Sequence, residues 1–447
     1  RYIMTAQTIL PANTLSSGYD VDNSIRFNSG DSAQMNKTLG TATDVDKYTI
    51  SMWVKRARLG HRQMMMRVIN PSSTSTYAFL EFQAGDSIGT NDYNGSSDGI
   101  AKITNAKFRD PSAWMHIVLA LDSTQGTGSD RSKLYVNGTQ ITSFSTDTDG
   151  TQNQNLMGNT SGKNIYIGGD GGQDTRYCGL YMAEVVFIDG QQLDATSFGE
   201  FDEDSGIWKP IDVSGLTFGN NGFYLDFEDS SNLGNDKNGG TDLTEVNLAA
   251  TDQSTDTCTN NFCTLNPLSK GTITLSEGNL QWQGSGDNGG KGTFLITAGK
   301  WYWEMKRGDS EDNVGFGVAV SNWTNAVNAA SGEAWYGYQG QAYKVSGGGE
   351  VSYGATFTNN DIVSCLFNAD DGILAFYKNG ASQGNAYTGL TNSDGYVPIY
   401  FTYRSSVTNY MNFGSPIHSI SSGNSDANGY GNFEYAVPSG FFSLCTK

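Results

Sequence analysis

One group of carboxylates in the sequence has a spacing that suits glycoside hydrolysis. It consists of Glu200, Asp202, Glu203 and Asp204. Hydrolysis of a sugar bond uses two carboxyl groups that flank the bond, for example from one face of a strand. Glu200 and Asp202 are two residues apart and would share one face of a strand. At the next position of that face, where a second glutamate would be expected, the sequence has Asp204. Acidic segments of this kind are usually solvated loops, so we expect no catalysis here.

Other catalytic arrangements are missing from the sequence. The chain has only three histidines, His61, His116 and His418, and His116 lies in a strand pattern where a packed or hydrogen-bonded ring is expected. There is no Gly-x-Ser-x-Gly elbow with a plausible triad, no Walker loop and no Rossmann fingerprint. We therefore predict that the protein is not an enzyme. A glycan depolymerase acting through Glu200 and Asp202 is the less favoured alternative.

Acidic loops offer candidate ligands for Ca²⁺, which prefers carboxylate, amide and carbonyl oxygens. Asp170 and Asp174 lie near the end of a predicted hairpin, and a second cluster begins at Asp226. Neither spacing matches an EF-hand loop, and a chain this acidic has such clusters without any metal. Asp170 and Asp174 are the candidate metal ligands, and we expect no other cofactor.

Aromatic and amide side chains suggest a binding site for sugars or receptors in the second half of the chain. Lectin sites stack aromatic rings on the apolar faces of sugars and use amides for hydroxyl groups. The candidate residues are Trp323, Trp335, Tyr336, Tyr338, Gln339, Gln341 and Tyr343. In the alternative interpretation they form an ordinary strand with Trp335 in the core. The segment Gln83–Ala101, with Tyr93, is a weaker candidate.

Composition and charge exclude several classes of protein. The chain of 447 residues has 56 Gly, 12% aromatic and 16% charged residues, which argues against a disordered chain or a coiled coil. Lys+Arg 27 against Asp+Glu 46 gives 27 − 46 = −19, so we predict no nucleic-acid binding. No apolar run approaches the roughly 20 residues of a membrane-spanning helix, and Arg1–Leu10 shows no secretory pattern.

The five cysteines have scattered spacing, which does not predict a disulfide framework. Only Cys258 and Cys263 lie close together, and a local disulfide between them is left open because geometry decides it. A zinc site is not expected, since no second cysteine pair or histidine pair accompanies them.

Period-2 alternation of apolar residues predicts strands along almost the whole chain. One face of Tyr48–Val54 is apolar, as is one face of Met115–Leu121, while Tyr181–Ile188 is apolar on both faces and should lie in the middle of a sandwich. Two Asn-Gly pairs, at Asn137 and Asn379, predict tight hairpins. The sequence therefore predicts an all-β protein of two antiparallel β-sandwiches joined by an irregular connector.

The first sandwich resembles the concanavalin A-like, laminin-G-type jelly roll. The resemblance rests on "YTISMWVKR", "AWMHIVLALD", "KLYVNG", "IYIGG" and "GLYMAEVVFIDGQQLD", which occur in the family's order. The second sandwich resembles a SPRY domain through "GKWYWEM", "NVGFGVAV", "DGILAFYKNG", "YVPIYF" and "MNFG". The expected organisation is an N-terminal arm 1–19, a jelly roll 20–200, an acidic connector 201–268, a SPRY-like sandwich 269–418 and a C-terminal extension 419–447.

The combination of these segments resembles virion structural proteins of tailed bacteriophages, which are usually called tail-fibre or tail proteins. This resemblance implies a virion subunit that is assembled in the host cytoplasm, contacts other virion proteins and copies of itself, and recognises a host-surface glycan or protein. The alternative is a purely structural or decorating subunit of the capsid or tail, without a receptor.

Overall fold

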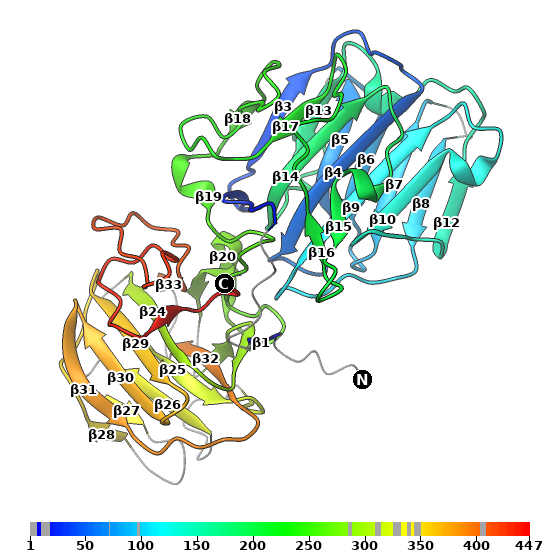
Figure 1. Ribbon diagram of the computed structural model, residues 1–447. Coiled ribbons are helices and arrows are strands. Elements are labelled where there is room, and N and C mark those ends of the chain that lie inside the picture. The colour runs from blue at the N-terminus through cyan, green and yellow to red at the C-terminus, as the bar shows by residue number, and fades with distance from the viewer. Residues whose placement is uncertain are drawn as a thin grey trace. The chain divides into compact units, whose positions relative to one another are not determined.

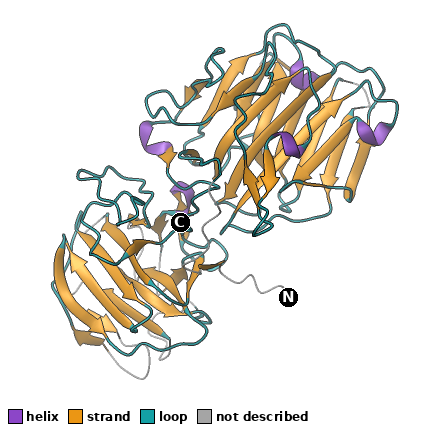
Figure 2. Ribbon diagram, in the orientation of Figure 1, coloured by secondary structure: helices purple, strands orange, loops and turns teal. Residues whose placement is uncertain are grey.

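The computed structural model describes residues 7–9, 18–70, 72–95, 99–284, 288–308, 314–324, 332–337, 341–343, 350–402 and 408–447. The chain divides into two compact units, Leu15–Thr259 and Asn260–Lys447, and the second also contains Arg1–Thr14 (Figure 1). Strands make up nearly all of the regular structure, and the helices are single turns (Figure 2). The predicted all-β class is confirmed. The 3-10 turns are η1 (Gly128–Asp130), η2 (Met157–Asn159), η3 (Ala195–Ser197), η4 (Ala250–Asp252) and η5 (Glu277–Asn279).

The first unit is a sandwich of two antiparallel sheets, named here the β4 sheet and the β6 sheet. The β4 sheet has the order β11 (Thr139–Gln140), β10 (Ser132–Val136), β9 (Trp114–Asp122), β4 (Lys47–Arg56), β14 (Leu180–Asp189), β2 (Ser24–Phe27) and β19 (Gln253–Ser254), with β17 (Phe223–Leu225) paired to β14. The β6 sheet has the order β12 (Phe144–Asp149), β8 (Ile100–Thr104), β7 (Ile88–Tyr93), β6 (Ser73–Phe82), β5 (Gln63–Asn70), β13 (Asn164–Ile167), β3 (Gln34–Thr38) and β18 (Thr244–Val246).

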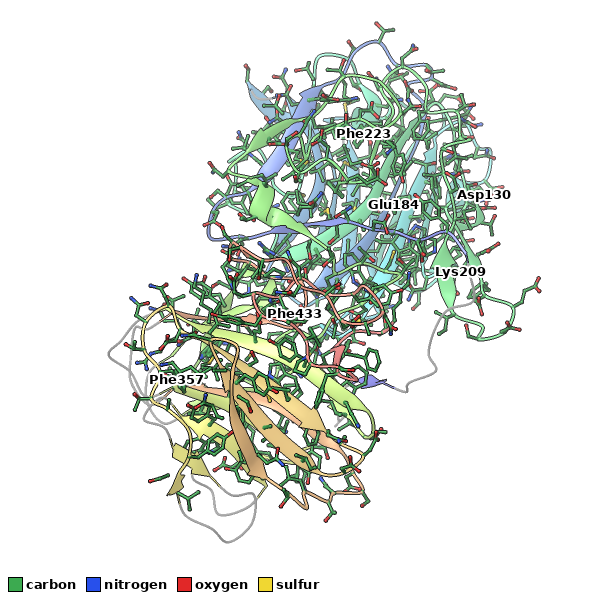
Figure 3. All side chains as sticks on the ribbon, turned by 60° about the vertical axis from the view of Figure 1, so that its left-hand side comes forward. Asp130, Glu184, Lys209, Phe223, Phe357 and Phe433 are labelled. Carbon is green, nitrogen blue, oxygen red and sulfur yellow. The ribbon has the colours of Figure 1, made fainter. Side chains whose placement is uncertain are left out.

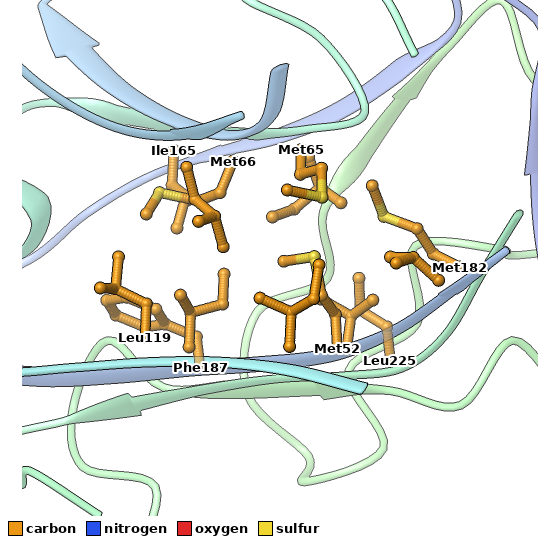
Figure 4. Close-up of a cluster of buried hydrophobic side chains, with 14 of the residues drawn as sticks. Met52, Met65, Met66, Leu119, Ile165, Met182, Phe187 and Leu225 are labelled. Atoms are coloured by element: carbon orange, nitrogen blue, oxygen red, sulfur yellow. The ribbon is translucent and has the colours of Figure 1, made fainter. Parts of the chain in front are cut away.

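The core of this sandwich lies between the two sheets and is rich in methionine (Figure 4). Met52 and Leu119 from the β4 sheet face Met66 and Ile165 from the β6 sheet. The predicted apolar faces of Tyr48–Val54 and Met115–Leu121 both lie in this core, so these predictions are confirmed. Burial of these side chains provides the main driving force for forming the sandwich.

A β-bulge at Glu184 interrupts the alternation of β14. Glu184 has φ of 50°, and the register with β4 shifts between Ala183 and Val186. Val185 therefore points into the core with Met182, whereas Ala183 and Val186 share the opposite face. Strict alternation would place Ala183 and Val185 on one face, but the bulge adds one residue and reverses the alternation of faces beyond it. The predicted central position of this strand is correct, since β4 and β2 flank it.

Residues 201–259 of the predicted connector belong to the same compact unit as the first sandwich. A hairpin of β15 (Gly199–Phe201) and β16 (Trp208–Pro210) leads into β17. Further along the chain, β18 adds an edge strand to the β6 sheet and β19 adds one to the β4 sheet. Phe198, Trp208 and Phe218 cover the outer face of the β4 sheet. These apolar side chains are far apart in the sequence, so simple periodicity did not associate them with the sandwich.

The second unit is also a sandwich of two sheets, named here the β25 sheet and the β24 sheet. The β25 sheet has the order β1 (Gln7–Ile9), β23 (Phe294–Ile296), β32 (Tyr396–Thr402), β25 (Val314–Val320), β26 (Glu333–Gly337), β27 (Gln341–Tyr343) and β28 (Glu350–Ser352), with β22 (Asn288–Lys291) paired to β32. The β24 sheet has the order β20 (Thr274–Ser276), β21 (Gln281–Gln283), β33 (Thr408–Asn412), β24 (Lys300–Arg307), β29 (Ile362–Asn368), β30 (Ile373–Lys378) and β31 (Ala381–Tyr387), with β34 (Phe442–Ser443) paired to β24. The pairings of β1 and β34 are parallel, and the others are antiparallel.

The predicted C-terminal extension covers the outer face of the β24 sheet. Phe433 meets the Tyr302 ring edge-on, with ring centroids 4.9 Å apart. The buried carboxylate of Glu304 accepts hydrogen bonds from the backbone N–H groups of Glu434 and Tyr435, at 3.0 and 2.9 Å. Because a buried carboxylate must be hydrogen-bonded to be tolerated, Glu304 fixes the position of the extension.

The two Asn-Gly pairs form the predicted tight turns. Asn137 and Gly138 have φ of 47° and 75°, and Asn379 and Gly380 have φ of 47° and 77°. Two successive positive φ angles are the signature of a type I′ turn, which matches the twist of the flanking strands. These turns join β10 to β11 and β30 to β31.

Candidate functional site

The acidic cluster near residue 200 lies on the hairpin of β15 and β16, where two of its carboxylates, those of Glu200 and Asp202, are ion-paired. Lys209 reaches Glu200 at 3.4 Å and Asp202 at 3.2 Å (Figure 3 labels Lys209). Asp202 is buried and also accepts the Ser205 N–H at 2.9 Å, which orders the turn. Two carboxylates drawn to one lysine do not flank a substrate bond. The geometry therefore gives no support to sugar hydrolysis at this hairpin.

His116 is a buried histidine with both ring nitrogens engaged. Its Nδ1 accepts a hydrogen bond from the indole of Trp208 at 3.0 Å, and its Nε2 lies 2.7 Å from the Ser51 hydroxyl. Trp53 stacks on the ring with centroids 4.9 Å apart. Burial lowers the pKa of His116 to about 3. This environment agrees with the predicted structural role.

Asp170 and Asp174 lie close together, but their carboxylates face arginines and backbone donors. Asp170 is fully buried and accepts the backbone N–H groups of Gly172 and Asp174, at 3.0 and 2.8 Å. Arg67 lies 3.3 Å from Asp174, and Arg176 lies 3.1 Å from it. In the part of the chain that the structure describes, no group of three or more His, Cys, Asp or Glu side chains is placed to hold a metal ion. The calcium prediction gains no support from this arrangement.

The described members of the aromatic patch in the second unit are buried. Trp323 and Trp335 lie in a cluster on the outer face of the β25 sheet, and Tyr336 lies in the core between the sheets. Their exposed fractions are 4%, 2% and 0%, so they present no ring face to a ligand. Tyr338 and Gln339 lie outside the described residues, and of Gln341 and Tyr343 only the backbone in β27 is described.

The strand alternative for this patch is correct, and Trp335 is buried in an apolar cluster, although this cluster lies on the outer face of the β25 sheet. Tyr336, not Trp335, points into the core between the two sheets. Trp335 packs instead on Phe401, with ring centroids 4.8 Å apart. Gly315 leaves space for this outer cluster. A Cβ atom at that position would lie 2.2 Å from the Phe401 ring.

All five cysteines lie in described parts of the chain, and each carries a thiol instead of a disulfide. The local bridge between Cys258 and Cys263 that the sequence left open is therefore not formed. Cys178, buried in the first core, lies 3.1 Å from the carbonyl oxygen of Met64. Burial holds the pKa of Cys178 well above its usual range, so this thiol is not poised for nucleophilic chemistry.

Three of the four outer sheet faces carry buried apolar clusters. These clusters cover the β4 sheet around Trp208, the β25 sheet around Trp335 and the β24 sheet around Phe433. Among the described residues, the outer face of the β6 sheet has no such cluster. This face is therefore the strongest candidate for a functional surface.

Tyr77, Phe79 and Tyr93 lie together on the outer face of the β6 sheet, and we call this surface the aromatic face. Tyr77 of β6 pairs with Tyr93 of β7 in the strand register. Tyr77 lies 5.3 Å from Tyr93 and 5.9 Å from Phe79 between ring centroids. All three side chains are partly exposed. Their neighbours Ala78 and Leu80 point into the core, so the rings point outward.

Polar side chains flank the aromatic face. In the strand register, Asn91 and Arg67 lie on either side of Phe79, and Tyr166 follows Arg67. The Asn91 side-chain oxygen makes no hydrogen bond within the described structure. The loop that holds Asp174 borders this region through its ion pair with Arg67. Rings beside amides are the combination that recognises sugars.

Comparisons with known families agree with this architecture. A model described as the concanavalin A-like lectin/glucanases superfamily matches residues 12–192, and the SPRY domain model matches residues 300–416. The chain contains a concanavalin A-like domain and a SPRY domain. The aromatic face belongs to the concanavalin A-like domain.

Curated relatives match only part of the chain. It is 33% identical over 99 residues to the probable ATP-dependent RNA helicase ddx1 of Dictyostelium discoideum, covering 22% of this chain and 12% of that protein. It is 33% identical over 132 residues to Ran-binding protein 9 of Xenopus tropicalis, covering 26% of this chain and 24% of that protein. The chain thus spans a quarter or less of these relatives.

Solved structures with similar parts include the SPRY domain of human HERC1, with 16% identity, a TM-score of 0.29 and coverage of 33% of this chain and 96% of that one. A heptameric SAP-like pentraxin from Limulus polyphemus has 14% identity, a TM-score of 0.29 and coverage of 39% and 80%.

The aromatic face is only weakly indicated by the amino-acid sequence. Tyr93 lies in the weaker candidate segment, Gln83–Ala101, whereas Tyr77 and Phe79 lie outside every predicted site. Their alternation with Ala78 and Leu80 is a signal that could have identified them. The pairing of β6 with β7, which brings Tyr77 beside Tyr93, is a long-range contact that a single sequence does not specify.

Proposed function

We propose that the protein is a non-enzymatic structural protein of a bacteriophage virion, a tail-fibre or surface-appendage subunit that recognises a host-surface glycan or protein. The order of its segments, which resembles that of such proteins, supports the phage setting. The observation that carries the binding role is the uncovered aromatic face of the concanavalin A-like domain. The ion-paired state of Glu200 and Asp202 supports binding without hydrolysis.

Attachment in this proposal depends on many weak contacts. Each copy offers one aromatic face, and many copies on one particle raise the effective concentration of sites near the host surface. Copies of this chain and other virion proteins hold the subunit in place. The remaining surface of the two sandwiches is available for these assembly contacts.

The alternative is a purely structural or decorating subunit of the capsid or tail. The apolar clusters covering three outer sheet faces favour a rigid body suited to packing between neighbours. A depolymerase acting at Glu200 and Asp202 is less well supported, since both carboxylates face Lys209.

The test is mass spectrometry of purified particles of the virus that encodes the chain, with gold-labelled antibodies against the SPRY domain. The proposal predicts stoichiometric amounts of the chain in particles, antibody label on the tail or surface, and binding of the isolated protein to host cells. Label without cell binding favours the purely structural alternative. Absence of the chain from purified particles contradicts both versions.

A further inference from the structure

We propose that copies of this chain associate head to tail, with the acidic hairpin of β15 and β16 in one copy docked on a cationic surface of the first unit in the next copy. We call this surface the basic rim. It consists of Arg58, Arg62, Lys107 and Arg109, which lie on the loops that join β4 to β5 and β8 to β9. The inference rests on the proposed function, in which copies contact each other, and it names the two surfaces that meet.

One buried carboxylate holds the basic rim together. Asp86 accepts hydrogen bonds from the backbone N–H of Gly60 at 2.7 Å and from the guanidinium groups of Arg56 and Arg109, at 3.0 and 2.9 Å. Its backbone carbonyl accepts the N–H of Phe108 at 2.8 Å. These bonds tie the loops after β4, β6 and β8 to one residue, so the rim has a fixed shape.

The carboxylate of Asp86 neutralises only part of the positive charge of the rim, because two arginines share it. Among the described residues, the side chains of Arg58 and Lys107 have no ion-pair or hydrogen-bond partner. The side chains of Arg109 and Arg62 are ion-paired but remain 52% and 37% exposed. The rim is therefore a positive surface on a chain whose net charge is −19.

The other acidic residues near the rim leave this positive charge in place. Glu81 is fully buried and paired with Arg62 and Arg176. Asp110 is exposed, and its carboxylate accepts the backbone N–H of Ser112 at 2.8 Å. The exposed charges of the rim are therefore mainly positive.

The hairpin of β15 and β16 offers the complementary surface. Glu203 and Asp204 are exposed at its tip, and neither carboxylate has a partner among the described residues. Phe201 and Ile207, on either side of the tip, are each 53% exposed. The buried carboxylate of Asp202 orders the turn between them. The tip thus combines free negative charge with exposed apolar side chains in a fixed shape.

The two surfaces match in apolar character as well as in charge. Leu59 and Phe108 are partly exposed within the rim and provide apolar contacts for the hairpin tip. Guanidinium groups pair with carboxylates and also stack on aromatic rings. Arg58 and Arg109 can therefore bind the carboxylates of the tip while covering the ring of Phe201.

A second copy is the partner that the charges favour. Two chains of net charge −19 repel each other in most orientations, whereas contact of the hairpin with the rim brings opposite charges together. Both surfaces belong to the first unit, and in the described structure of one copy no ion pair joins them. Because the two surfaces differ, each copy uses its hairpin on one neighbour and its rim on another. Such a contact generates a ring or a fibre.

This contact leaves the aromatic face free to bind a receptor. The rim lies near Phe82, at the end of β6 (Ser73–Phe82), because Arg56 stacks on the Phe82 ring at 4.1 Å. Tyr77 lies further back along the same strand. Association and attachment therefore use different parts of the first unit.

The experiment is sedimentation-velocity ultracentrifugation of the full chain over a range of protein concentrations, at low and high NaCl. The rim-reversed variant carries Arg58→Glu with Lys107→Glu, and the hairpin-reversed variant carries Glu203→Lys with Asp204→Lys. These four side chains have no partner among the described residues, so their reversal breaks no ion pair. Thermal unfolding of each variant confirms that it is folded.

The matched control is Asp22→Lys with Asp394→Lys, at two exposed carboxylates outside both surfaces. Like the hairpin-reversed variant, it changes the net charge from −19 to −15 (−19 + 2 + 2). General charge repulsion predicts that both variants associate more strongly than the native chain. The proposed contact predicts instead that the hairpin-reversed variant associates more weakly.

We expect the native chain to associate at low salt and to dissociate as salt rises, because exposed ion pairs are screened. Each reversed variant should associate about tenfold more weakly, while the control should not be weakened. An equimolar mixture of the two reversed variants should associate again, since every hairpin then meets a rim of opposite charge. The inference is overturned if the native chain stays monomeric, if the reversed variants associate as well as the native chain, or if mixing them restores nothing.

Failure of this inference is distinguishable from failure of the proposed function. A native chain that stays monomeric in solution overturns the head-to-tail contact, whereas the virion role is decided separately by the presence of the chain in purified particles. Conversely, association that is restored by mixing the reversed variants supports the contact even if the chain is absent from particles, which would overturn the virion role alone.

Discussion

The indole N–H of Trp208 donates a hydrogen bond to Nδ1 of His116 across 3.0 Å. Because Nδ1 accepts, the ring proton lies on Nε2, which donates to the Ser51 hydroxyl at 2.7 Å. Trp208 belongs to the segment that the sequence assigned to a separate connector. The bond therefore joins that segment to the β4 sheet and fixes the neutral form of His116.

The first prediction concerns the pH dependence that His116 confers. Its pKa falls from 6.5 to about 3 because the ring is buried. Between these values the unfolded chain binds a proton that the folded chain does not, so stability is lost as pH falls below about 6.5. The loss from this group is about 1.4 kcal/mol per pH unit. In urea unfolding, His116→Gln should show a smaller loss between about pH 6.5 and pH 4 than the native protein. Parallel profiles would contradict the assignment.

The second prediction concerns Glu184, whose contribution to stability changes with pH in the direction opposite to that of His116. Burial raises its pKa from 4.5 to about 7, although the Tyr224 and Tyr19 hydroxyls donate to Oε2 at 2.7 and 3.2 Å (Figure 3 labels Glu184). The nearby charges of Asp226 and Glu228 raise it further. The folded chain keeps this proton up to about pH 7, whereas the unfolded chain releases it near pH 4.5.

The contribution of Glu184 to stability is therefore present at low pH and is lost as pH rises through this range. Glu184→Gln, which remains neutral, should gain stability relative to the native protein between pH 5 and about pH 7. Chemical denaturation of both proteins across this range checks the expectation. A difference that stays constant with pH would show that Glu184 titrates normally.

The third prediction concerns the boundary of the concanavalin A-like domain. A fragment of residues 18–259 should unfold cooperatively, whereas a fragment of residues 20–200 should not. The shorter fragment lacks Trp208 and Phe218, which cover the β4 sheet. It also lacks Asp256, whose carboxylate lies 2.6 Å from the buried ammonium of Lys55. Leaving that charge unpaired costs about 3–5 kcal/mol. Cooperative unfolding of the 20–200 fragment by circular dichroism would contradict this boundary.

Local features of the fold were predictable from the sequence because their causes are local. Alternation placed Tyr48–Val54 and Met115–Leu121 correctly in the core. The turns at Asn137 and Asn379 followed from the tolerance of Asn and Gly for positive φ. These features depend on neighbouring residues only, so a single sequence specifies them.

Other features depend on long-range contacts and were missed. The bulge at Glu184 reversed the expected faces of β14, because nothing in the local pattern marks an inserted residue. Which of Trp335 and Tyr336 faces the space between the sheets depends on how β26 pairs with β25. The aromatic face likewise requires the pairing of β6 with β7. In each case the missing information is which strands become neighbours.

The fourth prediction distinguishes a structural from a ligand-stacking role for Trp335. It is 2% exposed and packs on Phe401. Trp335→Ala should lower the free energy of unfolding by about 3–5 kcal/mol, because it leaves a large cavity. Phe201→Ala, at a side chain that is 53% exposed, should change it by less than about 1 kcal/mol. A small effect at Trp335, measured by urea denaturation, would indicate that the ring is not part of the packed cluster.

The most direct test of the account is a cryo-electron microscopy map of the virus particle in which this chain is traced. We predict that the chain lies on the tail or outer surface, with the Tyr77, Phe79 and Tyr93 rings facing solvent. A map in which a neighbouring subunit covers these three rings, or a particle that lacks the chain, would contradict it.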